Sequence, residues 1–419
     1  MSSRGSMARV SPFTGIRYDP ARIDLADVLA PPYDVIGPEL QGELYSRALQ
    51  NIVRVELGKD YPGDAADGAD RYSRARDHLR PWLDQGFLMR DPEPSLYLHR
   101  HSFQLPGERG LHSRLGCFAS VEPVAHERRE VLRHELTLSG PREDRIRLLQ
   151  ATRTQTSPVF LLYEECPEVS VTMQEQVGLA EPVGDAVTDG EFGPERHELW
   201  RVTDPAALAS ICDGLSNTHL YIADGHHRYE TALRLHLPGV LALLAPLWDP
   251  GNVILPTHRL LPKSRLSADQ LATNLSGLGW DVAVLAWSAI PSRLAELRPT
   301  HHAFGILDSG SQFVVGRRRQ AESRPGAAAG LDVAVLDREI MEAQLGVVPK
   351  DSELGRLRYI RDPEELAAQA RARAALGFLL NPTSVEEMVE VALAGEAMPQ
   401  KSTYFFPKVP AGLVLMEAK

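Results

Sequence analysis

The stretch LYIADGHHRYETALRL, Leu220 to Leu235, gathers charged residues where an apolar run gives way to a helical pattern. An acid, a glycine, two histidines and an arginine follow the run. The positions i, i+3, i+4 and i+7 after the turn are held by Tyr229, Ala232, Leu233 and His236, so we expect a helix to begin at or just after Gly225. The sequence therefore predicts a strand, a tight turn and a helix N-terminus.

The residues of this turn are suited to binding an anion. The first N–H groups of a helix have no partners within it, and the helix dipole is positive at that end. Gly225 lets a phosphate approach closely, and Arg228 can hold it with a bidentate fork. His226 and His227 supply further donors. Asp224 would repel phosphate, so we expect it to bind Mg²⁺ carried on that phosphate or to orient a histidine.

Two other interpretations of the turn stay open. In the first, Asp224 caps the helix, Arg228 forms a surface ion pair and the histidines are ordinary polar residues. In the second, His226 and Glu230 share a helical face at i and i+4 with Asp224 close by. That arrangement could bind a metal ion if one further ligand is supplied from elsewhere.

A second group of candidate residues precedes a predicted helix in LRHELTLSGPREDR. Ser139, Gly140 and Pro141 form a good helix start, so His134 and Glu135 fall on the loop before it. A loop carboxylate can face a cleft and act as a base, although an isolated glutamate is more often a solvated surface acid. A third segment, ILPTHRLL, carries Thr257, His258 and Arg259, for which a structural role is the default.

Composition excludes several classes of protein. The chain has 419 residues, 43% of them apolar, which is enough for two or three globular domains. A net charge of −11 with no basic cluster argues against nucleic acid as a partner. We find no apolar run of membrane-spanning length and no signal-peptide core, and we expect a cytoplasmic protein. The three cysteines lack the spacing of a disulfide framework or a zinc site.

The order of apolar segments predicts a mixed α/β fold. Strands are expected at NIVRVEL, SLYLHRHSF, RLGCFASVEPV and SPVFLLY, which makes residues 1–125 a strand-rich lobe. Residues 164–198 are acidic and weakly periodic, which indicates an excursion between structured parts. A linker is expected near residues 318–330. Two helices follow, the second opened by Thr383 with Glu386 as a capping box, and the prolines of the last segment favour extended strands.

The chain contains five ordered motifs, namely APPYDVI, RHELTLSGPREDR, YIADGHHRYETAL, ILPTHRLL and MPQKSTYFFPKVPAGLV. Together they resemble the bacterial and archaeal domain-of-unknown-function 1015 family over essentially the whole chain. The DGHHR turn also resembles the nucleotide-binding motif of the ParB and sulfiredoxin superfamily, and most closely that of its free-serine kinases. Those kinases are similar in three places: a His-Glu pair before a helix, the DGHHR turn, and a C-terminal helix followed by Pro-x-Lys-[ST]-T.

The resemblance implies a ParB/sulfiredoxin-like nucleotide-binding core at residues 126–265, including the excursion, and an α/β lobe at residues 266–419 that closes on the active site. It implies that Glu135, beside His134, takes the proton from an acceptor hydroxyl. It also implies that the DGHHR turn holds nucleotide phosphates and Mg²⁺, and that a C-terminal segment closes on the substrate. The turn residues are Asp224, Gly225, His226, His227 and Arg228, and the closing segment is Lys401, Ser402 and Thr403.

The leading hypothesis is therefore Mg²⁺-dependent transfer of a phosphoryl group from ATP or ADP to the hydroxyl of a small metabolite, with free L-serine the first acceptor to test. A ParB-like nucleotide-binding switch without an acceptor is one alternative. A metal-dependent phosphatase or hydrolase acting on a phosphorylated metabolite is another. Glu135 distinguishes a kinase from a switch, because a switch has no need of an acceptor base.

Overall fold

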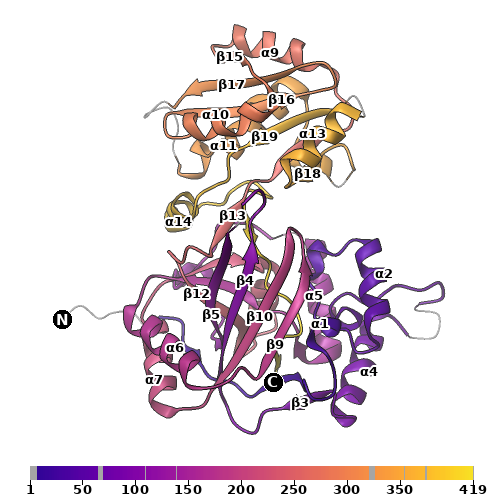
Figure 1. Cartoon of the computed structure of the whole chain (residues 1–419), viewed down its shortest axis with the longest axis vertical. Coiled ribbons are helices and arrows are strands. Elements are labelled where there is room, and N and C mark those ends of the chain that lie inside the picture. The colour runs from indigo at the N-terminus through magenta and orange to yellow at the C-terminus, as the bar shows by residue number, and fades with distance from the viewer. Residues whose placement is uncertain are drawn as a thin grey trace. The chain divides into compact units, whose positions relative to one another are not determined.

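The computed structural model describes residues 7–64, 69–108, 110–137, 139–319, 326–352, 354–372 and 375–418. The fold is mixed α/β, as the sequence predicts, and it divides into two compact units (Figure 1). The first unit comprises the chain up to Arg133, Thr137–Asn252 and the end of the chain from Pro407. The second comprises His134–Leu136 and Val253–Phe406. Within the described ranges, no helix is long and apolar enough to cross a bilayer.

The first unit is built on a nine-stranded mixed sheet with the order β6-β11-β8-β12-β5-β4-β10-β9, and β1 pairs with β5. One face carries the larger core, against which helices α6, α7 and α8 pack. A four-stranded sheet, β3-β2-β21-β7, lies beneath the N-terminal helices. The strands are β1 (Val10–Ser11), β2 (Gly15–Tyr18), β3 (Leu88–Arg90), β4 (Leu96–Gln104), β5 (Leu111–Val121), β6 (Val131–Leu132), β7 (Thr154–Gln155), β8 (Val159–Tyr163), β9 (Gly184–Gly190), β10 (Gly193–Val202), β11 (Leu220–Asp224), β12 (Val240–Pro246) and β21 (Leu415–Glu417).

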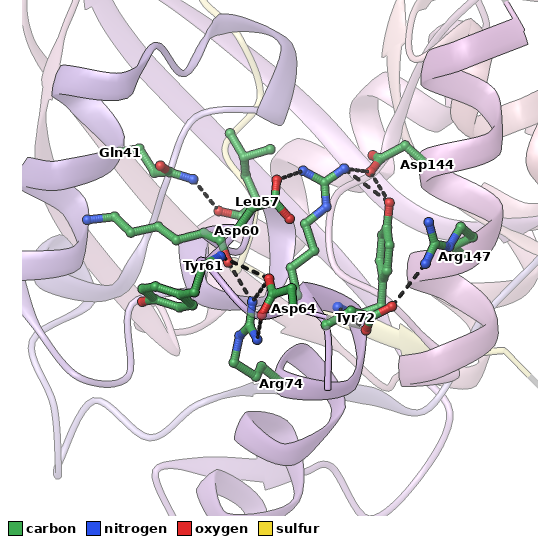
Figure 2. Close-up of polar contacts among 12 residues, drawn as sticks. Gln41, Leu57, Asp60, Tyr61, Asp64, Tyr72, Arg74, Asp144 and Arg147 are labelled. Atoms are coloured by element: carbon green, nitrogen blue, oxygen red, sulfur yellow. Dashed lines mark hydrogen bonds and ion pairs between the residues drawn. The ribbon is translucent and has the colours of Figure 1, made fainter. Parts of the chain in front are cut away.

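The helices of the first unit form two groups. Those before β3, together with α5, enclose a second apolar core, and α6 to α8 cover the large sheet. Tyr72 of α4 donates to Asp144 of α5 at 2.8 Å, and Arg147 pairs with Asp70, the cap of α4, at 2.9 Å (Figure 2). These bonds fix α5 against α4. The helices are α1 (Leu25–Val28), α2 (Pro38–Arg47), α3 (Val53–Glu56), α4 (Arg71–Asp84), α5 (Ser139–Thr152), α6 (Pro167–Leu179), α7 (Pro205–Leu215) and α8 (His226–Arg234), with 3-10 turns at Tyr33–Val35 and His126–Arg128.

The second unit has a six-stranded sheet with the order β15-β17-β16-β19-β14-β18, and a separate pair, β13 with β20. Its core lies between this sheet and helices α10 and α13. Its elements are β13 (Val253–Leu255), β14 (His258–Leu261), α9 (Ala268–Gly277), β15 (Asp281–Val284), α10 (Ile290–Leu297), β16 (His301–Leu307), β17 (Gln312–Arg318), α11 (Asp332–Val335), a π-helical stretch (Leu336–Glu342), α12 (Ala343–Leu345), β18 (Arg358–Ile360), α13 (Pro363–Ala372), β19 (Leu376–Leu380), α14 (Val385–Ala394) and β20 (Tyr404–Phe406), with 3-10 turns at Trp287–Ala289, Ala328–Gly330 and Pro349–Ser352.

The predicted strand NIVRVEL is wrong, because this segment forms helix α3. The Asn51 side chain accepts a bond from the backbone N–H of Val53 at 2.9 Å and donates to the carbonyl of Asp27 at 2.7 Å. This local bonding starts a helical turn despite the β-branched residues, whose strand preference is weak against tertiary context. The other three predicted strands are confirmed as β4, β5 and β8.

The predicted excursion at residues 164–198 is regular structure, namely α6, β9 and most of β10. Strand β10 pairs with β4 from Arg196 opposite Ser102 to Val202 opposite Leu96. Its inward positions include Glu195 and His197, both buried. Because these inward residues are polar, the alternation of apolar and polar residues that marks a strand is hidden.

Two further expectations differ from the structure. Residues 1–125 are not a separate lobe, because β4 and β5 belong to the same sheet as β8, β11 and β12. The capping box of α14 is formed by Ser384 with Glu387, one residue later than predicted. Thr383 instead donates its hydroxyl to the carbonyl of Ser402 at 3.0 Å. The extended character of the last segment is confirmed by β20 and β21, and residues 320–325 of the expected linker lie outside the described residues.

Candidate functional site

The predicted strand, turn and helix are present as β11, Gly225 and α8. Gly225 is the N-cap of α8 and has φ +89°, a left-handed conformation that glycine adopts without strain. A Cβ atom at this position would also lie 3.0 Å from Nε of Arg228. Glycine is therefore required both by the backbone and by the guanidinium that folds back over it.

Asp224 lies between two cations. Its Oδ2 accepts from Nη2 of Arg228 at 2.7 Å and its Oδ1 accepts from Nζ of Lys408 at 2.5 Å. Burial alone would raise the pKa of Asp224, but the charges of Lys408 and Arg228 outweigh it and hold that pKa well below its ordinary value. The carboxylate is therefore ionised at neutral pH, and both of its oxygens are used within the protein.

Arg228 is fixed from two sides. Besides Asp224, its guanidinium donates through Nη1 to the carbonyl of Pro158, just before strand β8. Its side chain is only 11% exposed. Next to it lies a small cavity of about 40 Å³ lined by Glu56, Arg145 and Ser157, among others. The fork predicted to bind phosphate is therefore held in a defined orientation by the protein itself.

The two histidines of the turn differ in exposure. His226 is buried, whereas His227 is half-buried. The carbonyl of His227 accepts from the hydroxyl of Thr231 at 2.8 Å. Glu230 accepts from His126 at 2.7 Å and from Arg133 at 3.2 Å. These partners differ from His226 and Asp224, with which the metal-site interpretation grouped it. A larger cavity of about 1120 Å³ borders Glu230 but not residues 224–228.

Sequence reasoning missed a buried polar network behind the turn. Glu56 accepts from Nη1 of Arg145 at 3.2 Å and from the hydroxyl of Ser157 at 2.9 Å, and also from Thr156. The guanidinium of Arg145 lies 3.9 Å from the ring centroid of Tyr33, in the motif APPYDVI. The sequence signal was that motif and an acid, Glu56, among the apolar residues of NIVRVEL. No sequence spacing joins these residues to the turn.

Lys408 was also missed as a site residue. Lys401 and Lys408 are two of only six lysines in the chain, and the resemblance pointed to the first. Lys401 is exposed and has φ +58°. Lys408 has a side chain that is 11% exposed and meets Asp224. Of the two, Lys408 is the lysine in the charge cluster of the first unit.

The other predicted residues lie in the second unit. His134 Nε2 is 2.9 Å from the hydroxyl of Thr403, and the carbonyl of His134 accepts from the N–H of Met398 at 2.8 Å. Ser402 donates to the carbonyl of Pro399 at 2.5 Å. Glu135 is half-buried, and its charge is one of those around Tyr359, whose pKa is raised mainly by burial. The structure thus joins the His-Glu pair to the closing segment, although about 270 residues separate them in sequence.

The predicted proximity of Lys401, Ser402 and Thr403 to the 224–228 turn stays a prediction, because the two groups belong to different units. His258 and Arg259 are both buried in the second unit. Nδ1 of His258 accepts from the N–H of Leu380 at 3.2 Å, and the pKa of His258 is lowered to about 3 by burial and by the charge of Arg259.

Comparison with known proteins identifies the family. The model of the family described as "Protein of unknown function (DUF1015)" matches residues 10–337. This chain belongs to the DUF1015 family. A search of curated proteins found no match.

Several solved structures are distantly similar to this DUF1015 protein. One is a free serine kinase in complex with AMP, 13% identical, with 73% of this chain and 91% of that chain covered and a TM-score of 0.39. A conserved hypothetical protein from Pyrococcus furiosus is 15% identical, with coverages of 71% and 93% and a TM-score of 0.35. SbnI from Staphylococcus aureus, with a C-terminal truncation, is 10% identical, with coverages of 70% and 84% and a TM-score of 0.36.

We predict that Lys408→Met destabilises the protein at neutral pH by up to about 3 kcal/mol, because Asp224 loses one of two partners in a buried site. A carboxyl with a lowered folded pKa contributes stability above its unfolded pKa of about 3.9 and loses it as the pH falls. The difference between variant and parent should therefore shrink below about pH 4. Urea unfolding at neutral and acid pH measures both effects.

Lys401→Met is the matched control, because its side chain is exposed and its loss should change the unfolding free energy by no more than about 0.5 kcal/mol. Equal stability of the two lysine variants at neutral pH would contradict the role assigned to Lys408.

Proposed function

We propose that this DUF1015 protein transfers a phosphoryl group from ATP or ADP to the hydroxyl of a small metabolite. The observation that carries the proposal is the compensation of Asp224 by Arg228 and Lys408 at the N-terminus of α8. An acid at this position would repel a phosphate, but two adjacent cations remove that objection. The first N–H groups of α8 and its dipole then favour a bound phosphate.

Nucleotide phosphates are the anion that we propose for the DGHHR turn, because the turn resembles the nucleotide-binding motif of the ParB and sulfiredoxin superfamily. The glycine cap of the turn makes no side-chain hydrogen bond to the first turn of the helix. Catalysis of phosphoryl transfer depends chiefly on positioning and on stabilising charge, and a buried, pre-oriented guanidinium and ammonium serve both purposes.

The acceptor side of the proposal rests on Glu135. It follows His134, which is bonded to Thr403, so the predicted base and the predicted closing segment share one unit. In the proposed reaction the acceptor hydroxyl gives its proton to Glu135 while its oxygen attacks the terminal phosphorus. The bond between that phosphorus and the bridging oxygen breaks, and ADP or AMP leaves.

Magnesium enters the proposal only through the nucleotide. Lys408 and Arg228 already offset the charge of Asp224, so the proposal assigns Mg²⁺ to the phosphates and not to this carboxylate. Mg²⁺ held by the phosphates would supply further charge neutralisation. The role that the contacts support for Asp224 is to orient the two cations.

The most direct test of the acceptor base is Glu135→Gln, which keeps the shape of the side chain and removes its basicity. We expect phosphorylation of the acceptor to fall by about a hundredfold or more, while nucleotide affinity and melting temperature stay near the parent values. The assay combines Mg²⁺, ATP or ADP and a panel of hydroxy metabolites headed by L-serine, with mass-spectrometric detection.

Glu386→Gln is the control for this experiment, because Glu386 is exposed in the same unit. If Glu135→Gln is as active as Glu386→Gln, Glu135 is not the base, and a nucleotide switch without an acceptor becomes the better description.

A separate prediction concerns the phosphate grip. Arg228→Lys keeps the charge, but one ammonium cannot reach Asp224 and the Pro158 carbonyl while presenting a planar fork. We expect nucleotide affinity, measured by calorimetry, to fall at least about tenfold. Arg293→Lys, at an exposed pair with Glu296, should leave it unchanged. Unaltered affinity in a folded Arg228→Lys protein would count against a phosphate at this turn.

A further inference from the structure

Three histidines meet on the face of the large sheet opposite helices α6 and α7. His99 and His101 are two residues apart on β4, so their side chains lie on the same face. His197 of β10 is directly opposite His101 in the register of the two strands. Strands β9, β10 and β4 are adjacent in the sheet (Figure 1). The fold therefore brings three imidazoles to one place on a rigid surface.

The distances suit a shared metal ion. One ring nitrogen of each histidine lies within 4.8 Å of one ring nitrogen of each of the others. Nε2 of His99 is 3.2 Å from Nδ1 of His197. Two nitrogens bound to the same tetrahedral zinc, each at about 2.0–2.1 Å, lie roughly 3.3–3.4 Å apart. All three side chains are buried, with exposed fractions of 1%, 0% and 2%.

Outer hydrogen bonds orient two of the rings. Nε2 of His101 lies 2.8 Å from a carboxylate oxygen of Glu195, and Nε2 of His197 lies 3.0 Å from the hydroxyl of Thr188. Each bond engages one ring nitrogen and leaves Nδ1 for another partner. A carboxylate that holds the far nitrogen of a histidine is a recurrent feature of metal sites, because it fixes the tautomer and increases the basicity of the ligand.

Burial also affects the ionisation of this cluster. It lowers the pKa of all three histidines well below its ordinary value, and the buried guanidinium of Arg114 acts in the same direction. Burial raises the pKa of Glu195 to about 7, despite the opposing charge of Arg114.

A network of hydrogen bonds alone does not account for the cluster. In the described part of the chain, Nδ1 of His99 and Nδ1 of His101 are buried without a hydrogen-bond partner. Burying a polar atom in this way costs about 1–3 kcal/mol. Among the residues that the structure describes, this is the one group of three metal-ligating side chains with converging ligand atoms. An ion bound by Nε2 of His99, Nδ1 of His197 and Nδ1 of His101 would satisfy one of these two nitrogens, that of His101.

We propose that His99, His101 and His197 bind a divalent transition-metal ion of the zinc type, with Glu195 as the outer partner of His101. Three imidazoles suit zinc and its spectroscopic substitute cobalt, and not magnesium or calcium, which prefer oxygen ligands. The site is distinct from the Asp224 cluster, and its test does not depend on the proposed phosphoryl transfer.

The first experiment measures metal content in the whole chain, expressed with added Zn²⁺ or Co²⁺ and purified without chelator. Elemental analysis should find about one ion per chain, and the cobalt form should show the visible absorption of a tetrahedral nitrogen-bound ion. His197→Gln should lower the affinity at least about a hundredfold, and Glu195→Gln about tenfold or more. His112→Gln, which alters a partly exposed histidine paired with Glu108, should bind as the parent does.

The second experiment needs no variant and so does not depend on any variant folding. Zn²⁺ that binds only the folded state should raise the melting temperature of metal-stripped parent protein in a concentration-dependent way. Parent protein that purifies without metal and is not stabilised by Zn²⁺ or Co²⁺ overturns the proposal. Equal metal binding by folded His197→Gln and His112→Gln overturns it as well.

Discussion

The ionised carboxylate of Asp224 is the constraint on which the first unit depends. It ends strand β11, pairs with Arg228 one turn into α8, and pairs with Lys408 from a segment 184 residues further along the chain. A charge buried to this extent is costly unless it is compensated, and removing one member of such a group typically costs several kcal/mol. The pairing therefore requires the end of the chain to return to the large sheet.

Other contacts hold the returning segment in place. Arg114 of β5 donates to the carbonyl of Pro407 at 3.2 Å, and the N–H of Ala411 donates to the carbonyl of Ala30 at 2.8 Å. The N–H of Gly412 donates to the carbonyl of Thr156 at 3.0 Å. The segment thus joins strand β5, the APPYDVI motif and the short connection between β7 and β8. These hydrogen bonds set the position of the returning segment. As a consequence, the ammonium of Lys408 lies next to Asp224.

The cations at the turn are also tied to the N-terminal helices. Arg228 bonds to the carbonyl of Pro158, and the preceding Ser157 donates to Glu56 of α3. Glu56 in turn accepts from Arg145 of α5, which also pairs with Asp144. Helix α5 thereby links the turn to α4. A substrate phosphate would meet groups whose positions are fixed before it binds, which is the condition for electrostatic catalysis.

Local patterns predicted the turn well, because its features are local. The apolar run before Asp224, the glycine and the helical spacing from Tyr229 are all contiguous, and β11 and α8 follow them. Lys408 could not be assigned in this way, because its partner lies far away in sequence and nothing in the local pattern separates it from Lys401. Asn51 shows a related limit, since one side-chain bond to the Val53 N–H converts a β-branched segment into a helix.

Inward-facing polar residues account for the other failure of prediction. Glu195 and His197 occupy positions of β10 that normally carry apolar residues, so the segment reads as an irregular, charged excursion. The same two residues contribute to the histidine cluster of the large sheet. The irregular pattern of this segment was thus the sequence signal of a buried polar site. The signal could be interpreted only once the pairing of β10 with β4 was known.

The central claim is that the turn at Gly225 receives nucleotide phosphate. An experimental structure of the parent protein crystallised with ADP and Mg²⁺ tests it most directly. The account predicts phosphate oxygens within about 3 Å of the N–H groups of the first turn of α8, with Arg228 and Lys408 directed to the same anion. A nucleotide bound elsewhere in the chain, with the N-terminus of α8 occupied only by solvent, would contradict it.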